Sequence, residues 1–287
     1  MHREKFIERV LLLLALSSVG SLALITIFIF LEGFPLILSV GVKDFILSSH
    51  WAPTKGHFGI LAMIISSVLV TLGAMVIGVP LGLSCAIVLA ELSPQRLKMV
   101  LKPTLELLAG IPSVVYGFLG VIWLVPLIRN YLGGPGLSLL AASIILGIMI
   151  LPTVISISID ALTAVPDLYR DGSLALGATR WQAIRSAVLP PTTPGIAAGI
   201  VLGSSRALGE TMAVLMVVGN VVQVPKSIFD AAYPVPALLA NNYGEMMSIP
   251  LYDAALMGAA FILALLVLLF NILSTMVLRR YKKRYQT

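Results

Sequence analysis

Two ionisable residues, Arg206 and Glu210, lie four positions apart in the otherwise apolar or small stretch GIVLGSSRALGETMAVLMVVGN, which runs from Gly199 to Asn220. A charge in the middle of a bilayer costs roughly 2.5–3.5 kcal/mol on insertion scales, so such residues usually face protein or a water-filled path and are functional. Arginine is always charged and presents a planar set of donors that suits phosphate-like oxyanions. We therefore expect Arg206 to bind an oxyanion in transit, with Glu210 holding its guanidinium until the anion arrives.

If the stretch is one helix, the two charges share a face with three glycines. At about 100° per residue, Gly195, Gly199, Gly203, Arg206 and Glu210 fall within an arc of about 80°. Stripes of small residues let another helix approach closely, so the pair should face a neighbouring helix or a cavity between helices, not lipid. The alternative is a self-neutralising ion pair with a structural role, although Arg before Glu at i, i+4 is the weaker order for that purpose.

The composition is typical of a membrane protein with several spans. Of the 287 residues, 59% are hydrophobic and 11% are charged, whereas an ordinary soluble domain is about 45–50% apolar and about 25% charged. A helix needs about 20 apolar residues to cross the hydrocarbon. We therefore expect an all-α fold with one transmembrane domain over 1–287 and six spans, at about 10–31, 59–90, 103–128, 137–162, 195–222 and 253–278.

The basic residues gather on one side of these spans. Fourteen of the 19 Lys and Arg residues fall in the N-terminus, the loops after the second and fourth spans, and the C-terminal tail. The positive-inside rule then places both termini in the cytoplasm, so the net charge of +6 is a topology signal and nucleic-acid binding is not expected. Two long loops on the opposite side, 32–58 and 222–252, either cap the spans or dock an external partner. The segment 234–246 is suited to a short helix.

The sequence lacks the motifs of an enzyme with its own energy source. It has no G-x-x-x-x-G-K-[ST] loop, so we expect no ATP site. It has one cysteine, Cys85, and no Cys/His cluster for a metal. No series of carboxylates crosses the expected membrane region. If transport is uphill, the energy is expected to enter through another subunit.

The loop between the fourth and fifth spans, 164–191, is expected to form a short helical elbow outside the bilayer. Its sequence from Val165 onward is VPDLYRDGSLALGATRWQAIRSAVLPP. Pro166 suits the first turn of a helix, and Gly172 and Gly177 are expected to divide the segment into short pieces. The elbow is either an interfacial connector or a knob that fits a cleft on a cytoplasmic motor protein.

This elbow resembles the Glu-Ala-Ala loop of ABC importer permeases. Aligned on Gly177, the chain has Asp171-Gly172-Ser173 at the Glu-Ala-Ala positions and Leu189-Pro190 at the end. Three further stretches resemble the permeases of phosphate-specific ABC importers, namely LKPTLELLAGIPSVVYGFLG (101–120), RALGETMAVLMVVGN (206–220) and HWAPTKGHFGIL (50–61). The first of them, with Glu106 near its start, is similar to the PstC-type subunit.

The resemblance implies the type I permease fold of ABC importers and import of inorganic phosphate through a multi-pass subunit of the cell inner membrane. It implies a second homologous permease, two cytoplasmic ATP-binding subunits that hold ATP and Mg, and an external phosphate-binding protein, with no cofactor or metal on this chain. The elbow would contact the ATPase through Asp171, Gly177, Ala178, Thr179, Trp181, Leu189 and Pro190.

Three alternatives remain open from the sequence. The first is a permease of the same architecture for another oxyanion, such as sulfate or molybdate. The second is a stand-alone secondary transporter coupled to protons or Na⁺. The third is a membrane scaffold or sensor that transports nothing, in which Arg206 would be dispensable for uptake.

Overall fold

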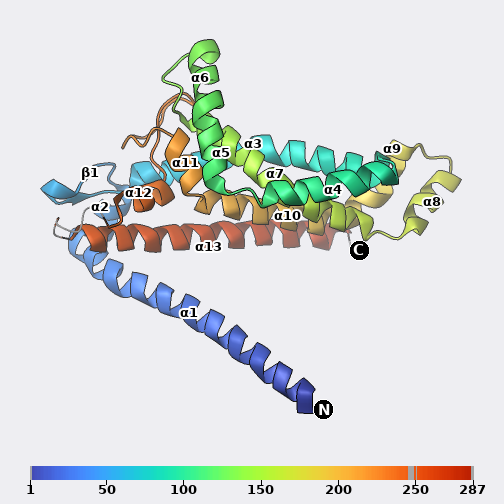
Figure 1. Ribbon diagram of the computed structural model, residues 1–287, viewed down its shortest axis with the longest axis horizontal. Helices are drawn as coiled ribbons and strands as arrows, with labels where there is room; N and C mark the ends of the chain where they lie inside the picture. Colours follow the sequence, from blue (N-terminus) through green and yellow to red (C-terminus); the bar gives the residue numbers. More distant parts are fainter. Residues whose placement is uncertain (1, 245–248, 250, 286–287) are drawn as a thin grey trace. The chain divides into compact units, whose positions relative to one another are not determined.

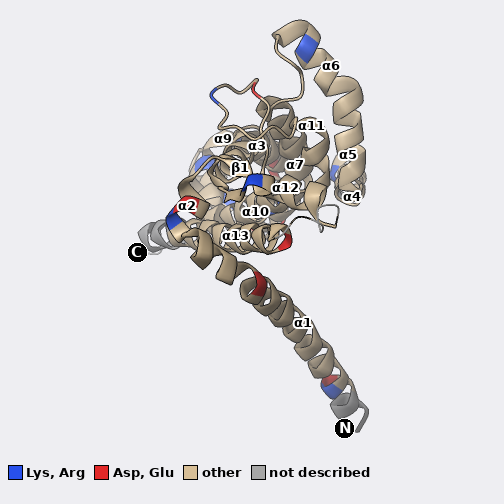
Figure 2. Cartoon of the chain, turned by 90° about the vertical axis from the view of Figure 1, so that its left-hand side faces the viewer, with Lys and Arg blue, Asp and Glu red and all other residues tan. Residues whose placement is uncertain are grey.

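The computed structural model describes the backbone of residues 2–244, 249 and 251–285 and, within these, all side chains except those of 2–6, 95, 102, 106 and 277–285. Helices make up most of it (Figure 1). Within this part, six helical segments are long and apolar enough to cross a membrane: Ile7–Val40, Leu61–Leu92, Ser113–Leu132, Leu139–Thr163, Arg180–Gly209 and Tyr252–Met276. Few acidic or basic residues interrupt the long helices (Figure 2). The predicted all-α fold with six apolar helices is confirmed.

The chain divides into two compact units, and the first comprises residues 1–61 and 242–265. It contains α1 (His2–Val40), α2 (Val42–Leu47), η1 (Pro53–Lys55), the antiparallel strands β1 (Trp51–Ala52) and β2 (His57–Phe58), and the first part of α13 (Tyr252–Tyr285). α1 packs against α13 where Gly33 touches the backbone of Gly258, because neither residue has a side chain to separate the helices. The loop 32–58 thus contains the end of α1, α2 and a hairpin.

The second unit comprises residues 62–241 and 266–287. Its first half contains α3 (Leu61–Ile87), the π-helical turn η2 (Val88–Leu92), α4 (Gln95–Ala109), α5 (Ser113–Leu119), η3 (Gly120–Leu124), α6 (Val125–Leu127), η4 (Ile128–Leu132) and α7 (Leu139–Thr163). Its second half contains α8 (Asp167–Ala175), α9 (Arg180–Ala183), η5 (Ile184–Val188), α10 (Leu189–Gly209), α11 (Met212–Val217) and α12 (Val235–Asn242). α12 is the short helix expected within 234–246, of which residues 245 and 246 lie outside the described residues.

The core of the second unit is built around α7, which is the most buried of the six apolar segments. One hydrophobic cluster joins α3, α7 and α11 and includes Val70, Leu146, Ile150 and Val214. A second cluster joins the end of α3 with η2, α7 and η5 and includes Leu89, Leu162 and Val188. The two clusters fix both ends of α7 among its neighbours.

The third span differs from the prediction of 103–128. α4 ends at Ala109, and α5 begins only at Ser113, after Pro112. A residue before proline is pushed away from the helical region, so Ile111-Pro112 interrupts an apolar run that looks continuous in the sequence. The helical segment able to span the membrane is Ser113–Leu132, and 95–109 forms a helix of its own.

Candidate functional site

The fifth apolar segment is a broken helix, so the prediction of a single helix over 195–222 is wrong. α10 ends at Gly209, and Glu210 has φ −70° and ψ 132°, an extended conformation. A second, short helix begins at Met212. Two local features favour the break. Glycine is a poor helix former, and Glu210 Oε1 accepts a hydrogen bond at 3.5 Å from the Ala213 N–H, in the first turn of the new helix.

The break separates the two charges instead of pairing them. Arg206 lies in the last turn of α10, where the carbonyl end of a helix stabilises a cation, and Glu210 precedes α11, where the amide end stabilises an anion. Among the described residues, the Arg206 guanidinium has no hydrogen-bond or ion-pair partner. The expected Arg206–Glu210 ion pair is therefore absent. The side chain of Arg206 is exposed in this chain alone.

The glycine stripe of α10 does face a neighbouring helix, as predicted. A Cβ at Gly199 would lie 3.1 Å from Ile157 Cβ, and a Cβ at Gly203 would lie 3.1 Å from Val154 Cγ2, both on α7. Arg206 follows these glycines but does not share their contact. Because burial of an unpaired cation in an apolar contact is costly, its exposure outside the α7–α10 contact is physically reasonable.

Tyr116 of α5 is a polar side chain within electrostatic range of Arg206, and it was not predicted. The positive charge of Arg206 acts electrostatically on the Tyr116 hydroxyl, which donates a hydrogen bond to Leu108 O at 2.9 Å. α5 approaches α11 closely at Gly117, where a Cβ would lie 3.0 Å from Ala213 Cα. The available sequence signal was a tyrosine inside an apolar span, followed by a glycine.

The segment 164–191 is a helical elbow made of α8 and α9, and η5 leads from it directly into α10. Gly177 lies between α8 and α9 with φ +85°, a backbone conformation that favours glycine. Gly172 lies inside α8 and does not divide it, contrary to the expectation. Leu189 and Pro190 begin α10, because proline is well tolerated in the first turn of a helix.

The remaining predicted elbow residues lie at or near its surface. Thr179 caps α9 through a reciprocal pair of bonds with Gln182: its Oγ1 accepts from Gln182 N at 3.3 Å, and its N–H donates to Gln182 Oε1 at 2.8 Å. The spacing Thr-x-x-Gln is a known sequence signal for this cap. Asp171 and Trp181 are exposed, and Ala178 is half-buried.

The elbow also exposes large hydrophobic side chains that were not predicted as contacts. Leu168 is 78% exposed and Leu176 is 91% exposed, and Tyr169 and Leu174 are exposed as well. These four residues lie outside the six apolar helices. Exposed apolar side chains gathered on one element indicate an interaction surface.

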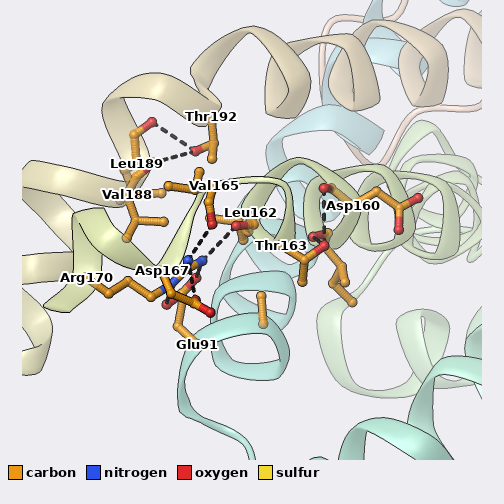
Figure 3. A network of polar contacts seen from close by, with 12 residues as sticks. Glu91, Asp160, Leu162, Thr163, Val165, Asp167, Arg170, Val188, Leu189 and Thr192 are labelled. Atoms are coloured by element: carbon orange, nitrogen blue, oxygen red, sulfur yellow. Dashed lines mark hydrogen bonds and ion pairs between the residues drawn. The ribbon is translucent and has the colours of Figure 1, made fainter.

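An unpredicted ion pair joins the elbow to the end of α3 (Figure 3). Arg170 Nη2 lies 2.7 Å from Glu91 Oε1, and Arg170 Nε lies 3.0 Å from Glu91 Oε2. The hydrogen bond to Glu91 raises the pKa of Arg170 above its ordinary value, against the opposing effect of burial. Beside the pair, Asp171 and Arg180 help to line a cavity of about 190 Å³.

A larger cavity lies in the first unit, beside the β1–β2 hairpin. It measures about 910 Å³ and is lined by Asp44, His50, Lys55 and His57 among others. Within the described part of the chain, no group of three His, Cys, Asp or Glu residues is placed to hold a metal ion.

A family model described as the binding-protein-dependent transport system inner membrane component matches residues 78–286, which include the elbow, α10 and α11. The chain belongs to this family. It is therefore a multi-pass protein of the inner membrane and a component of a membrane-embedded ABC transporter.

Individual relatives cover most of the chain. It is 44% identical over 236 residues to a probable ABC transporter permease, YqgH, of Bacillus subtilis, covering 80% of this chain and 76% of that protein. It is 35% identical over 261 residues to the phosphate transport system permease protein PstC of Mesorhizobium japonicum, covering 84% of this chain and 80% of that one. A probable PstC of Methanocaldococcus jannaschii is 31% identical over 277 residues, covering 89% of this chain and 87% of that one.

Solved structures agree on the fold. An inward-facing MetNI methionine ABC transporter matches with a TM-score of 0.59 at 20% identity, covering 75% of this chain and 93% of the other. A bacterial ABC transporter that imports the acidic polysaccharide alginate matches with a TM-score of 0.63 at 17% identity, covering 98% and 99%. The fold is that of type I ABC importer permeases.

Proposed function

We propose that this chain is the membrane-spanning permease subunit of an ATP-driven importer of inorganic phosphate. The observation that carries the choice of phosphate is the 35% identity to a phosphate transport permease over 84% of the chain. The family match supports the transport role independently of the substrate.

Arg206 is the substrate-path residue in this proposal, with Glu210 beside it. The guanidinium has an exposed set of donors and no partner among the described side chains, so a phosphate oxygen can approach it without displacing an ion pair. Glu210 lies between α10 and α11 and accepts a hydrogen bond from the Ala213 N–H of α11, which favours the broken geometry that presents Arg206 at a helix end. Phosphate then passes the apolar barrier by way of one fixed positive charge.

The proposed complex contains a second homologous permease, two cytoplasmic ATP-binding subunits and an external phosphate-binding protein. ATP and Mg belong to the ATP-binding subunits, and this chain acts without an ATPase site or cofactor of its own. Both termini face the cytoplasm in this proposal, because most Lys and Arg residues fall in the two termini and in the loops expected on the same side of the spans, and cytoplasmic loops carry an excess of these residues. The second permease would cover Arg206, which this chain alone leaves exposed.

The elbow is the proposed seat for the ATP-binding subunits. Its exposed apolar residues support this role, because Leu168 and Leu176 are 78% and 91% exposed and such residues gathered on one element indicate an interaction surface. The predicted contact residues are Asp171, Gly177, Ala178, Thr179, Trp181, Leu189 and Pro190, of which the last two begin α10.

The test is phosphate uptake by the assembled complex in proteoliposomes, with Arg206→Gln and Arg206→Lys. A charged hydrogen bond contributes about 1.5–3 kcal/mol, so Arg206→Gln should lower uptake about 10- to 150-fold. Arg206→Lys should retain part of the activity if charge alone matters, and little if the planar fork is needed.

Arg129→Gln is the matched control and should leave uptake unchanged, because among the described residues the Arg129 guanidinium of η4 donates only to the nearby Pro135 carbonyl. Uptake that persists without ATP and collapses with an ionophore would instead identify a secondary transporter. Competition by sulfate or molybdate at equal strength would identify a different oxyanion.

A further inference from the structure

Arg170 uses every donor it has. Its guanidinium carries five N–H groups, and two of them reach Glu91, at 2.7 and 3.0 Å. Two others bind main-chain oxygens at the end of α7, with Nη2 to Leu162 O at 2.8 Å and Nη1 to Val165 O at 2.6 Å. The fifth binds Asp167 Oδ1 at 3.2 Å. One side chain therefore holds α8, the end of α7 and the end of α3 together (Figure 3).

The rest of α8 is weakly attached. It has no buried residue, and it packs only against its sequence neighbours α9 and η5 among the main contacts between elements. Burial of apolar surface is the main force that fixes a helix on a protein. Because α8 lacks such burial, Arg170 is its principal connection to α3 and α7.

The other end of the connection is firmly built into the protein. The Glu91 side chain is only 6% exposed and lies in η2, the π-helical turn that directly continues α3. The neighbouring residues Leu89 and Ala90 belong to the hydrophobic cluster with Leu162 and Val188. Lys98 of α4 donates to Ala90 O at 2.6 Å, so α4 is tied to the same turn. A displacement of Glu91 must therefore move the end of α3 with it.

We propose that Arg170, in its bidentate ion pair with Glu91, is a positioning residue for transport: it transmits a displacement of the elbow helix α8 to the adjoining ends of α3 and α7. This inference rests on the proposed function, in which an ATP-binding subunit pushes or pulls on the elbow. Arg170 contacts no substrate in this proposal, and its role is to couple ATP hydrolysis to the movement of the membrane-spanning helices.

The chemistry of the pair suits a mechanical link. Two parallel bonds between a guanidinium and a carboxylate fix orientation as well as distance. A lysine would supply the charge without this fork. The Arg170 side chain is 21% exposed, so solvent and salt screen the pair less than an open surface pair.

The test uses the complete complex in proteoliposomes, with the external phosphate-binding protein added. It measures the number of phosphate ions imported per ATP hydrolysed. Glu91→Gln keeps the shape of the side chain but removes its charge, and Arg170→Lys keeps the charge but removes the fork. Each should lower the ratio about tenfold, a typical size for coupling between sites, while ATP hydrolysis stays within about twofold of wild type. Arg96→Ala is the control, because it removes an exposed cation of α4 without touching the pair.

A second readout follows the end of α3 directly. A spin label on Leu92→Cys, in a Cys85→Ser background, should change its mobility when ATP binds the wild-type complex and should not respond in Glu91→Gln. A normal change in label mobility on ATP binding, together with an unchanged number of phosphate ions imported per ATP in both variants, would contradict the proposed role of Arg170. Proportional loss of hydrolysis and uptake, with a normal label response, would reduce Arg170 to a stabilising residue. Failure of the wild-type complex to import phosphate would contradict the proposed function, whereas the label response to ATP still tests the link.

Discussion

Arg206 is close to a glutamate in the sequence, and Arg170 is close to one in space. The two arginines differ in whether an ion pair forms. Arg206 lies four residues from Glu210, yet the helix breaks between them and no ion pair forms among the described residues. Arg170 lies 79 residues from Glu91 in sequence, yet the two form a bidentate pair. Nearness in sequence is thus a poor guide to which charges meet in the fold.

The presence or absence of hydrogen-bond partners indicates different roles for the two arginines. An arginine without partners keeps its hydrogen-bonding capacity for something outside the chain, as a substrate site requires. An arginine with five acceptors has none left to offer, and it can only hold parts of the protein together. Removal of the first should affect transport more than stability, and removal of the second should affect stability and coupling.

The largest expected difference in stability comes from Glu91→Ala compared with Arg206→Ala. Removing one partner of a buried pair leaves a charge without compensation, so Glu91→Ala should lower the free energy of unfolding by about 3 kcal/mol. Arg206→Ala removes no described contact and should stay within about 0.5 kcal/mol. Unfolding of the purified chain in mixed detergent–SDS micelles measures both values.

A double variant sharpens this comparison. Glu91→Ala combined with Arg170→Ala should be less destabilising than the sum of the two single changes, because the second change removes the uncompensated charge. Simple additivity of the two effects would mean that the pair does not act as a unit.

The sequence predicted the six apolar helices and the elbow, because apolar runs, prolines and glycines are local signals. It did not predict the break at Glu210, since the apolar pattern continues from Ala207 to Val217 on both sides of it. It also did not predict Glu91 with Arg170, because nothing local indicates which of several elbow arginines meets a glutamate at the end of α3. Contacts between distant segments depend on how helices pack, which a single sequence does not state.

The next largest effect compares the middle of α10, the helix that carries Arg206, with its C-terminal end at the break. Gly199→Leu should cost about 2 kcal/mol, because the added atoms meet Ile157 of α7 and force the helices apart. Gly209→Ala has nothing within 4 Å to meet and should stay within about 0.5 kcal/mol. Thermal unfolding followed by circular dichroism compares the two. Equal costs would show that α10 is held at its broken end as firmly as along the glycine stripe.

The smallest effect tests whether α8 is stiff enough to act through Arg170. Gly172 lies inside α8 with open space around it, so Gly172→Ala should stabilise the elbow by about 0.5–1 kcal/mol. Gly177 has φ +85° and equally open surroundings, so Gly177→Ala should cost about 1 kcal/mol through backbone strain alone. Hydrogen exchange of the amides of 167–176 should slow in the first variant and quicken in the second. If slower exchange in Gly172→Ala is accompanied by less phosphate imported per ATP, the elbow must bend during transport. Arg170 would then restrain a flexible helix and would not transmit the displacement of a rigid one.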